Sequence, residues 1–327
     1  LITVWETATG KKLKSFRGHE AGYVHSLAFS PDGTRIASAS SGDGTARLWE
    51  TRTGKELHTL NVNSRYLYSV VFSPDGKILA TGDSTVKLWD PQTGKELRRI
   101  QGPGHGIVSL AFSPDGKTLA SGGNISTLNL WDLATGKMLR EFQGSAGRVS
   151  SVAFRPDGKT LASGGDDGRV QLWDVATGKE KFKTGGHRGP VNAVAVGPDG
   201  KQIATGGADA TLKLWDIATA QVVRTIARKL DDGRDAYIGS VAFSPDGERI
   251  AAAGAADHVE VWDTTSGAEL MNLRHPADGS WIGTVRFSPD GKWIAVAGGG
   301  SKSEDSIHCW DAVTGKEVLR LGTDDHY

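Results

Sequence analysis

Short stretches of alternating apolar and polar residues run along the whole chain, and residues 149 to 183 show the pattern most clearly. Val149, Val152 and Phe154 supply the apolar positions of a first strand, and residues 161 to 164 form a second. Residues 170 to 173 alternate polar with apolar side chains, as expected for a strand with one buried face. No segment keeps an apolar period of 3.6 residues, so we expect almost no helix.

Glycine-containing turns separate these strands. Residues 155 to 158 turn the chain after the first strand, where proline sets φ and glycine can adopt a positive φ. Residues 166 to 168 and 176 to 179 turn it again, and a polar strand begins at residue 181. Alternate charges in this last strand suit an exposed sheet edge. One unit therefore consists of four antiparallel strands, which we label a to d.

The same unit recurs along the chain, marked by a Pro-Asp-Gly turn and a later tryptophan. The turns begin at Pro31, Pro74, Pro114, Pro156, Pro198, Pro245 and Pro289, and the tryptophans are Trp49, Trp89, Trp131, Trp173, Trp215, Trp262 and Trp310. The tryptophans recur every 40 to 48 residues. A four-stranded unit with this period is typical of a propeller blade. We therefore predict an all-β protein, a seven-bladed β-propeller of four-stranded antiparallel blades.

The N-terminal segment leaves the closure of the ring open. Residues 1 to 17 hold an extra c–d hairpin, and residues 18 to 327 hold the seven repeats. Because the chain begins inside a repeat, we expect residues 1 to 327 to form a single propeller from a longer polypeptide. The hairpin either completes the ring by exchange with the last c and d strands or lies outside it. The alternative is an eight-bladed ring, with the hairpin as part of the eighth blade.

Composition excludes several classes of site. Lys plus Arg and Asp plus Glu each number 38, so no overall positive field favours nucleic acid or an anionic membrane. Cys309 is the only cysteine, which excludes an internal disulfide and a Cys-based zinc cluster. Residues 231 to 235 are acidic but lack the spacing of a calcium loop. We expect no cofactor, no metal and no membrane insertion, and a cytoplasmic monomer.

Two further motifs connect the chain to a known family. Six of the seven tryptophans are followed by aspartate, and Gly-His precedes strand a at Gly18-His19 and Gly186-His187. With these motifs the chain resembles the WD-repeat β-propeller family over essentially its whole length. Its regular Ser-Pro-Asp-Gly and Thr-Gly-Lys turns resemble those of bacterial members, which often lie beside kinase, protease or nucleotide-binding domains.

The resemblance implies a hydrogen-bonded tetrad inside each blade, made by a histidine, a strand-b hydroxyl, a turn aspartate and the strand-c tryptophan. Ile125, Ala252 and Val296 interrupt it in repeats three, six and seven. A hydrolase triad uses the same residue types but occurs once, so we interpret the recurring set as structural. The tetrads that are complete are His19, Ser38, Asp43 and Trp49 in repeat one and His187, Thr205, Asp209 and Trp215 in repeat five.

Partners of this family usually bind at the end of the ring where the d–a loops open. We aligned the repeats on the first apolar residue of strand a, taken as Val108 in repeat three. The preceding position then reads Tyr23, Tyr66, Ile107, Arg148, Pro190, Tyr237 and Trp281, and the following position adds His25 and Tyr68. The aromatic residues belong to repeats six, seven, one and two, which become neighbours in a closed ring.

Aromatic and arginine side chains are frequent anchors of recognition surfaces. We therefore predict a non-catalytic scaffold that binds a protein or peptide through Tyr23, His25, Tyr66, Tyr68, Arg148, Tyr237 and Trp281. Longer d–a loops at residues 228 to 235 and 274 to 280 favour the same sector. Two alternatives remain open: the aromatic residues only pack the channel, or the propeller is an architectural or sensor module for another domain of its own polypeptide. A hydrolase is disfavoured, since no single acid–base pair interrupts the repeat.

Overall fold

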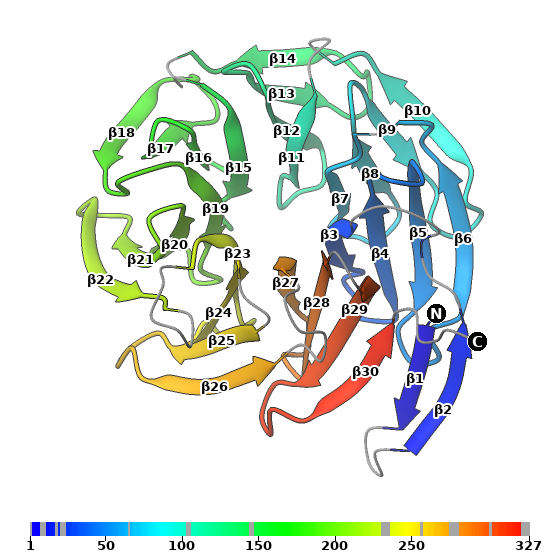
Figure 1. The fold of residues 1–327 in the computed structure, drawn as a ribbon. Coiled ribbons are helices and arrows are strands. Elements are labelled where there is room, and N and C mark those ends of the chain that lie inside the picture. Colours follow the sequence, from blue (N-terminus) through cyan, green and yellow to red (C-terminus); the bar gives the residue numbers. More distant parts are fainter. Residues whose placement is uncertain are drawn as a thin grey trace.

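Seven antiparallel sheets surround a central axis in the computed structural model (Figure 1). It describes residues 2–6, 11–16, 19, 24–64, 66–102, 106–143, 147–229, 236–255, 258–274, 281–300 and 303–321. Six sheets have four strands and one has six, and none of these residues is helical. The predicted all-β, seven-bladed propeller is thus confirmed, and the eight-bladed alternative is not found.

In every blade strand a lies nearest the channel, and in blades one to six strand d lies at the rim (Figure 1). Blade one contains β3 (Val24–Phe29), β4 (Arg35–Ser40), β5 (Thr45–Glu50) and β6 (Glu56–Asn61). Blade two contains β7 (Ser69–Phe72), β8 (Leu79–Gly82), β9 (Val86–Trp89) and β10 (Glu96–Ile100). Blade three contains β11 (Ile107–Phe112), β12 (Thr118–Gly123), β13 (Leu128–Asp132) and β14 (Met138–Glu141). Blade four contains β15 (Val149–Phe154), β16 (Thr160–Gly165), β17 (Arg169–Asp174) and β18 (Glu180–Gly185).

The remaining blades follow the same order. Blade five contains β19 (Val191–Val196), β20 (Gln202–Gly207), β21 (Thr211–Asp216) and β22 (Gln221–Ala227). Blade six contains β23 (Ile238–Phe243), β24 (Arg249–Gly254), β25 (His258–Asp263) and β26 (Glu269–Arg274). Blade seven contains β27 (Trp281–Phe287), β28 (Trp293–Gly300), β29 (Ser303–Asp311) and β30 (Glu317–Leu321).

The N-terminal hairpin lies outside the ring. β1 (Ile2–Glu6) pairs antiparallel with β30 and with β2 (Lys11–Phe16), so the sheet of blade seven continues outward as β27, β28, β29, β30, β1 and β2. All four inner strands of this sheet come from the C-terminal part of the chain (Figure 1). Of the two arrangements expected for a seven-bladed ring, the structure has the one without strand exchange.

The Pro-Asp-Gly turns are stabilised by local hydrogen bonds. In the turn of blade two, Asp75 Oδ1 accepts the Ser73 hydroxyl at 2.6 Å and the backbone N–H of Lys77 at 3.0 Å. Gly76 adopts a φ of 69°, which favours glycine. The Ser73 hydrogen bond is the main reason that the pKa of Asp75 lies below its ordinary value. The turn aspartates therefore bond the nearby backbone, as expected for such turns.

The core lies between the blades. The strand-c tryptophan of each blade packs against the preceding blade: Trp173 meets Phe142 of blade three edge to face, with ring centroids 5.7 Å apart. Trp49 packs with Ala295 and Ala297 of blade seven in the same way. The apolar packing of the tryptophan that closes the ring is therefore of the same kind as at the other contacts between blades.

Candidate functional site

The tetrad of blade one is built around Ser38, which is fully buried. Trp49 Nε1 donates to Ser38 Oγ at 2.9 Å, and Ser38 Oγ lies 2.7 Å from His19 Nε2. His19 Nδ1 lies 2.9 Å from Asp43 Oδ2. Because the indole N–H only donates and the carboxylate only accepts, the bonds run from tryptophan through serine and histidine to aspartate.

The low pKa of Asp43 agrees with this direction of the hydrogen bonds. Burial raises the pKa of Asp43, but the hydrogen bond and charge of His19 and the hydrogen bonds from Thr45 outweigh it, and the pKa falls to about 2. The carboxylate is thus ionised at neutral pH and held by its partners. Such buried, mutually bonded groups fit a structural role, because none of their bonds is left for a substrate.

Blade five repeats the geometry. His187 Nδ1 lies 2.9 Å from Asp209 Oδ1, and His187 Nε2 lies 2.7 Å from Thr205 Oγ1. Trp215 Nε1 donates to the same Thr205 Oγ1 at 2.8 Å. Burial lowers the pKa of His187. The pKa of Asp209 is again about 2, because bonds from His187, Arg188 and Thr211 outweigh its burial. Among the described residues of blades two, three and four, the strand-c tryptophan donates to Thr81, Ser121 and Ser163 at 2.8 to 2.9 Å, and His105 of repeat three lies outside the described residues.

Blade six contains a different buried polar network that the sequence reasoning missed. Arg228 is 1% exposed, and its Nε donates to Glu260 Oε2 at 2.5 Å while Nη2 donates to the carbonyl of His258 at 2.6 Å. Glu260 stands opposite Ala252, the position without a hydroxyl. A glutamate in the middle of strand c beside that alanine was the available signal.

The strand register corrects one position of the predicted binding face. Leu110 pairs with Ser121 as Leu27 pairs with Ser38, so Ile107 is the equivalent of Val24. The alignment on Val108 is wrong because either of two adjacent apolar residues could begin the strand in the sequence. The residue before strand a in repeat three is therefore Gly106 rather than Ile107, which is 1% exposed. Val108 instead lines the channel.

Three of the predicted anchors form one contiguous cluster over blades one and two, which we call the mouth cluster: His25, Tyr66 and Tyr68. The rings of His25 and Tyr68 meet edge to face with centroids 5.0 Å apart, and those of Tyr66 and Tyr68 are 6.4 Å apart. Tyr66 is 65% exposed, whereas the other two are half-buried. His25 Nε2 lies 2.9 Å from Ser41 Oγ, which fixes its ring.

Other predicted anchors lie at the same register in other blades. Tyr237, in blade six, is 40% exposed, and a Cβ added at Gly239 would meet its ring at 3.4 Å, so the ring takes the space that the small residue leaves. Arg148, in blade four, is half-buried and within electrostatic reach of His25: burial and then the Arg148 charge lower the pKa of His25. Tyr23 and the side chain of Trp281 lie outside the described residues.

Below the mouth cluster, the strands a enclose a polar cavity of 150 Å³. The residue two positions after the equivalent of Val24 carries a hydroxyl in six blades, and in five of them its oxygen accepts a backbone N–H of the next blade. These pairs are Ser26 with Val70, Ser69 with Leu110, Ser109 with Val152, Ser151 with Val194 and Ser240 with Val285, at 2.9 to 3.2 Å. We call these residues, with Thr284, the hydroxyl ring.

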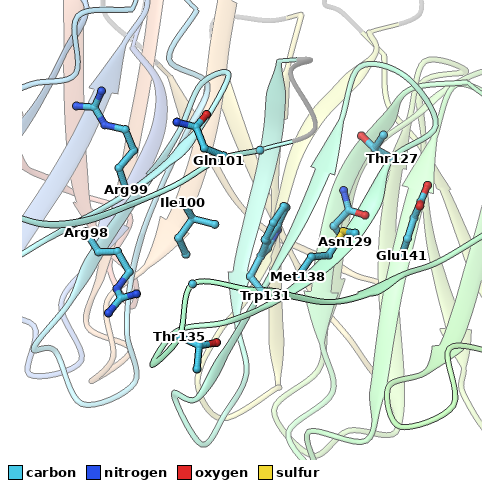
Figure 2. Close-up of a pocket in the computed structure, with 12 residues that line it drawn as sticks. Arg98, Arg99, Ile100, Gln101, Thr127, Asn129, Trp131, Thr135, Met138 and Glu141 are labelled. Carbon is cyan, nitrogen blue, oxygen red and sulfur yellow. The ribbon is translucent and has the colours of Figure 1, made fainter.

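A larger groove of 590 Å³ lies on the outer wall between blades two and three. Figure 2 shows Arg98, Arg99 and Ile100 of β10 on one side of it and Trp131 and Met138 on the other. A groove of 360 Å³ lies between blades four and five, with Phe182 of β18 in its wall. Because such grooves recur between outer strands, we attribute them to blade packing rather than to a specific ligand.

Other kinds of site were sought in the part of the chain that the structure describes. There, no three histidine, cysteine, aspartate or glutamate side chains are grouped closely enough to hold a metal ion. The same residues include no helix with the length and apolar character needed to cross a membrane.

Comparison with known proteins gives seven matches to the family model "WD domain, G-beta repeat", at residues 10–50, 54–90, 94–132, 136–174, 178–216, 225–263 and 268–311. The chain is 39% identical over 75 residues to the small ribosomal subunit protein RACK1 of Neurospora crassa and to MST50-interacting protein 11 of Pyricularia oryzae. Both matches cover 23% of each chain. An uncharacterised WD repeat-containing protein of Synechocystis, sll1491, is 40% identical over 80 residues, 24% of this chain and 23% of its own. The chain thus spans about a quarter of the length of these curated relatives.

Proposed function

Because the chain belongs to the WD-repeat family, we propose that it is a non-catalytic scaffold that binds a protein or peptide segment at the mouth of its channel. The observation that carries the proposal is the mouth cluster. Tyr66 presents 65% of its surface to solvent beside two further aromatic rings, on the end of the ring where the d–a loops meet strand a. Exposed aromatic groups that are already held in place are typical of recognition surfaces.

The arrangement of these side chains supports an anchoring role. Tyr68 is fixed between His25 and Tyr66, so little conformational entropy is lost when a partner binds. Tyr66 combines an apolar ring with a hydroxyl that can bond a peptide backbone. Tyr237 offers a second exposed ring at the same register in blade six. The channel therefore has aromatic groups on more than one part of its rim.

The relatives and the chemistry of the tetrads point in the same direction. One matched protein is named for its interaction with MST50, and another is named as a protein of the small ribosomal subunit. The Ser, His and Asp groups that a hydrolase would need are bonded to one another in the two tetrads. A partner domain within the same polypeptide would use the same surface.

The test is a selection of peptides from a random displayed library on the immobilised propeller, followed by affinity measurement on variants. We expect Tyr66→Ala to weaken the selected peptides by about 2 kcal/mol, roughly 30-fold, because central aromatic anchors carry most of the binding energy. Leu97→Ala is the matched control, since Leu97 is 56% exposed on the outer strand β10. Equal loss in both variants, or none in Tyr66→Ala, would refute the mouth as the binding surface.

A further inference from the structure

One residue interrupts the regularity of the channel wall. The residue four positions after the equivalent of Val24 is small and apolar in six blades, where it is Ala28, Val71, Ala111, Ala153, Ala195 and Ala242. In blade seven the same position is Arg286, since Val285 pairs with Val296 as Leu27 pairs with Ser38. A long cation thus lies where the other blades have a small apolar side chain.

The guanidinium of Arg286 points into the channel and is only partly bonded. Nη1 donates to the carbonyl of Val285 at 2.7 Å and to Ser240 Oγ of the hydroxyl ring at 3.2 Å. Nη2 and Nε have no hydrogen-bond partner among the described residues. None of the described residues that line the cavity is an aspartate or glutamate. The positive charge is therefore not compensated by a nearby carboxylate.

Arg286 is half-buried in this cavity, and partial removal from water makes the lack of a counterion unfavourable. Desolvation lowers the pKa of Arg286, yet a guanidinium remains charged at neutral pH. A charge removed from water without a partner is unfavourable unless a ligand supplies the opposite charge. The side chain that the other blades carry at this position would avoid the cost altogether.

Thr284 provides a second unpaired group in the same cavity. It is 2% exposed, and its Oγ1 has no hydrogen-bond partner, although five other members of the hydroxyl ring bond the next blade. Thr284 and Arg286 are two residues apart on β27 and so face the same side of the strand. Buried hydroxyl groups are nearly always bonded, so this one indicates a missing partner.

We propose that the channel contains an oxyanion-binding site in which the guanidinium of Arg286 and the hydroxyl of Thr284 donate hydrogen bonds to a carboxylate or phosphate group. The cavity of 150 Å³ is smaller than the roughly 300 to 1,000 Å³ of sites for drug-sized ligands, so it suits one anionic group rather than a whole cofactor. Arg148 adds a second cation nearer the mouth, with its Nε buried and unpaired. We assign the anionic group to an acidic side chain of the segment bound at the mouth, and this source rests on the proposed function.

The site is tested with inorganic phosphate alone, titrated by calorimetry at constant ionic strength into the protein and its variants. Arg286→Ala introduces the residue that five other blades carry, so the fold accommodates it. We expect phosphate affinity to fall at least about tenfold in this variant, because hydrogen bonds to a charged group are lost. Arg99→Ala, on the outer wall, is the control and keeps the affinity of the unmodified protein. Equal phosphate binding by Arg286→Ala and the unmodified protein, or no phosphate binding by either, would overturn the site.

A second arm separates the site from its source. A capped tetraglutamate peptide is expected to displace phosphate from the unmodified protein, whereas capped tetraglutamine is not. If phosphate binds through Arg286 but tetraglutamate does not displace it, the oxyanion site stands and its ligand is a free anion. If Tyr66→Ala abolishes peptide binding while phosphate binding is unchanged, the mouth and the oxyanion site are both supported as separate parts of one surface.

Discussion

Replacing His19 by alanine is expected to lower the free energy of unfolding by about 2 to 3 kcal/mol. The variant removes the bond to Ser38 Oγ at 2.7 Å and the bond to Asp43 Oδ2 at 2.9 Å. Ser38 is fully buried, so water cannot replace its lost partner, at a cost of about 1 to 3 kcal/mol. Asp43 keeps bonds from Thr45 and an ion pair with Arg47 at 3.4 Å, so its contribution lies near the lower end for a charged group.

Urea unfolding followed by circular dichroism measures this loss. The matched control is His58→Ala, because His58 makes a single bond to the carbonyl of Gln92 near the surface, and we expect a change within about 0.5 kcal/mol. A double-mutant cycle of His19→Ala with Asp43→Asn should give a coupling energy of at least about 0.5 kcal/mol. Midpoints that coincide for His19→Ala and His58→Ala, at the same slope, would refute the reasoning.

Three other measurements follow from the structure. The pKa of Asp43 is about 2 in the folded protein, below its ordinary value of 3.8, so the carboxylate stabilises the fold above about pH 4. On the order of 2 kcal/mol should therefore be lost in acid titration as the pH falls through 2. Gly164→Ala should reduce the free energy of unfolding by about 1 to 3 kcal/mol and so lower the melting temperature, because the new Cβ would lie 2.5 Å from Val191 Cγ1. Glu260→Ala should cost about 3 to 5 kcal/mol in urea unfolding because the buried charge of Arg228 loses its carboxylate partner; a cost below about 1 kcal/mol would contradict the buried ion pair.

The fold could be predicted from sequence because its signals are local and repeated. Each Pro-Asp-Gly turn and each strand-c tryptophan marks the same place in its own blade, so an error in one repeat is corrected by the others. The strand ranges expected for blade four, 161 to 164 and 170 to 173, agree with β16 and β17 to within one residue at each end. The arrangement of the N-terminal hairpin could not be chosen, because β1 carries a strand-c tryptophan like that of β29, and only the structure shows that β29 is the strand that pairs with β28.

The candidate site could be predicted only in part, because it depends on register and on contacts between distant segments. Two adjacent apolar residues, Ile107 and Val108, gave no basis for choosing the start of strand a, and pairing with β12 decides it. His258 belongs to no tetrad in the sequence, yet its side chain is buried, and its Nε2 lies 3.6 Å from Glu260 Oε1. Arg286 becomes noticeable only when the residues four positions after the equivalents of Val24 are compared in all seven inner strands, in the observed register.

The hydroxyl ring makes the joint between blades seven and one unlike the others. In five blades a serine hydroxyl oxygen accepts a backbone N–H of the next blade. In blade five, Asn192 Nδ2 instead donates to the carbonyl of Ile238 in blade six at 3.0 Å. Thr284 makes no such bond, so this joint relies on the apolar contact of Trp49 with β28 and on the pairing of β1 with β30. The joint between blades seven and one is therefore the expected starting point of local unfolding. In native-state hydrogen exchange, we expect the ring to open first at this joint and to leave the other six joints between blades intact.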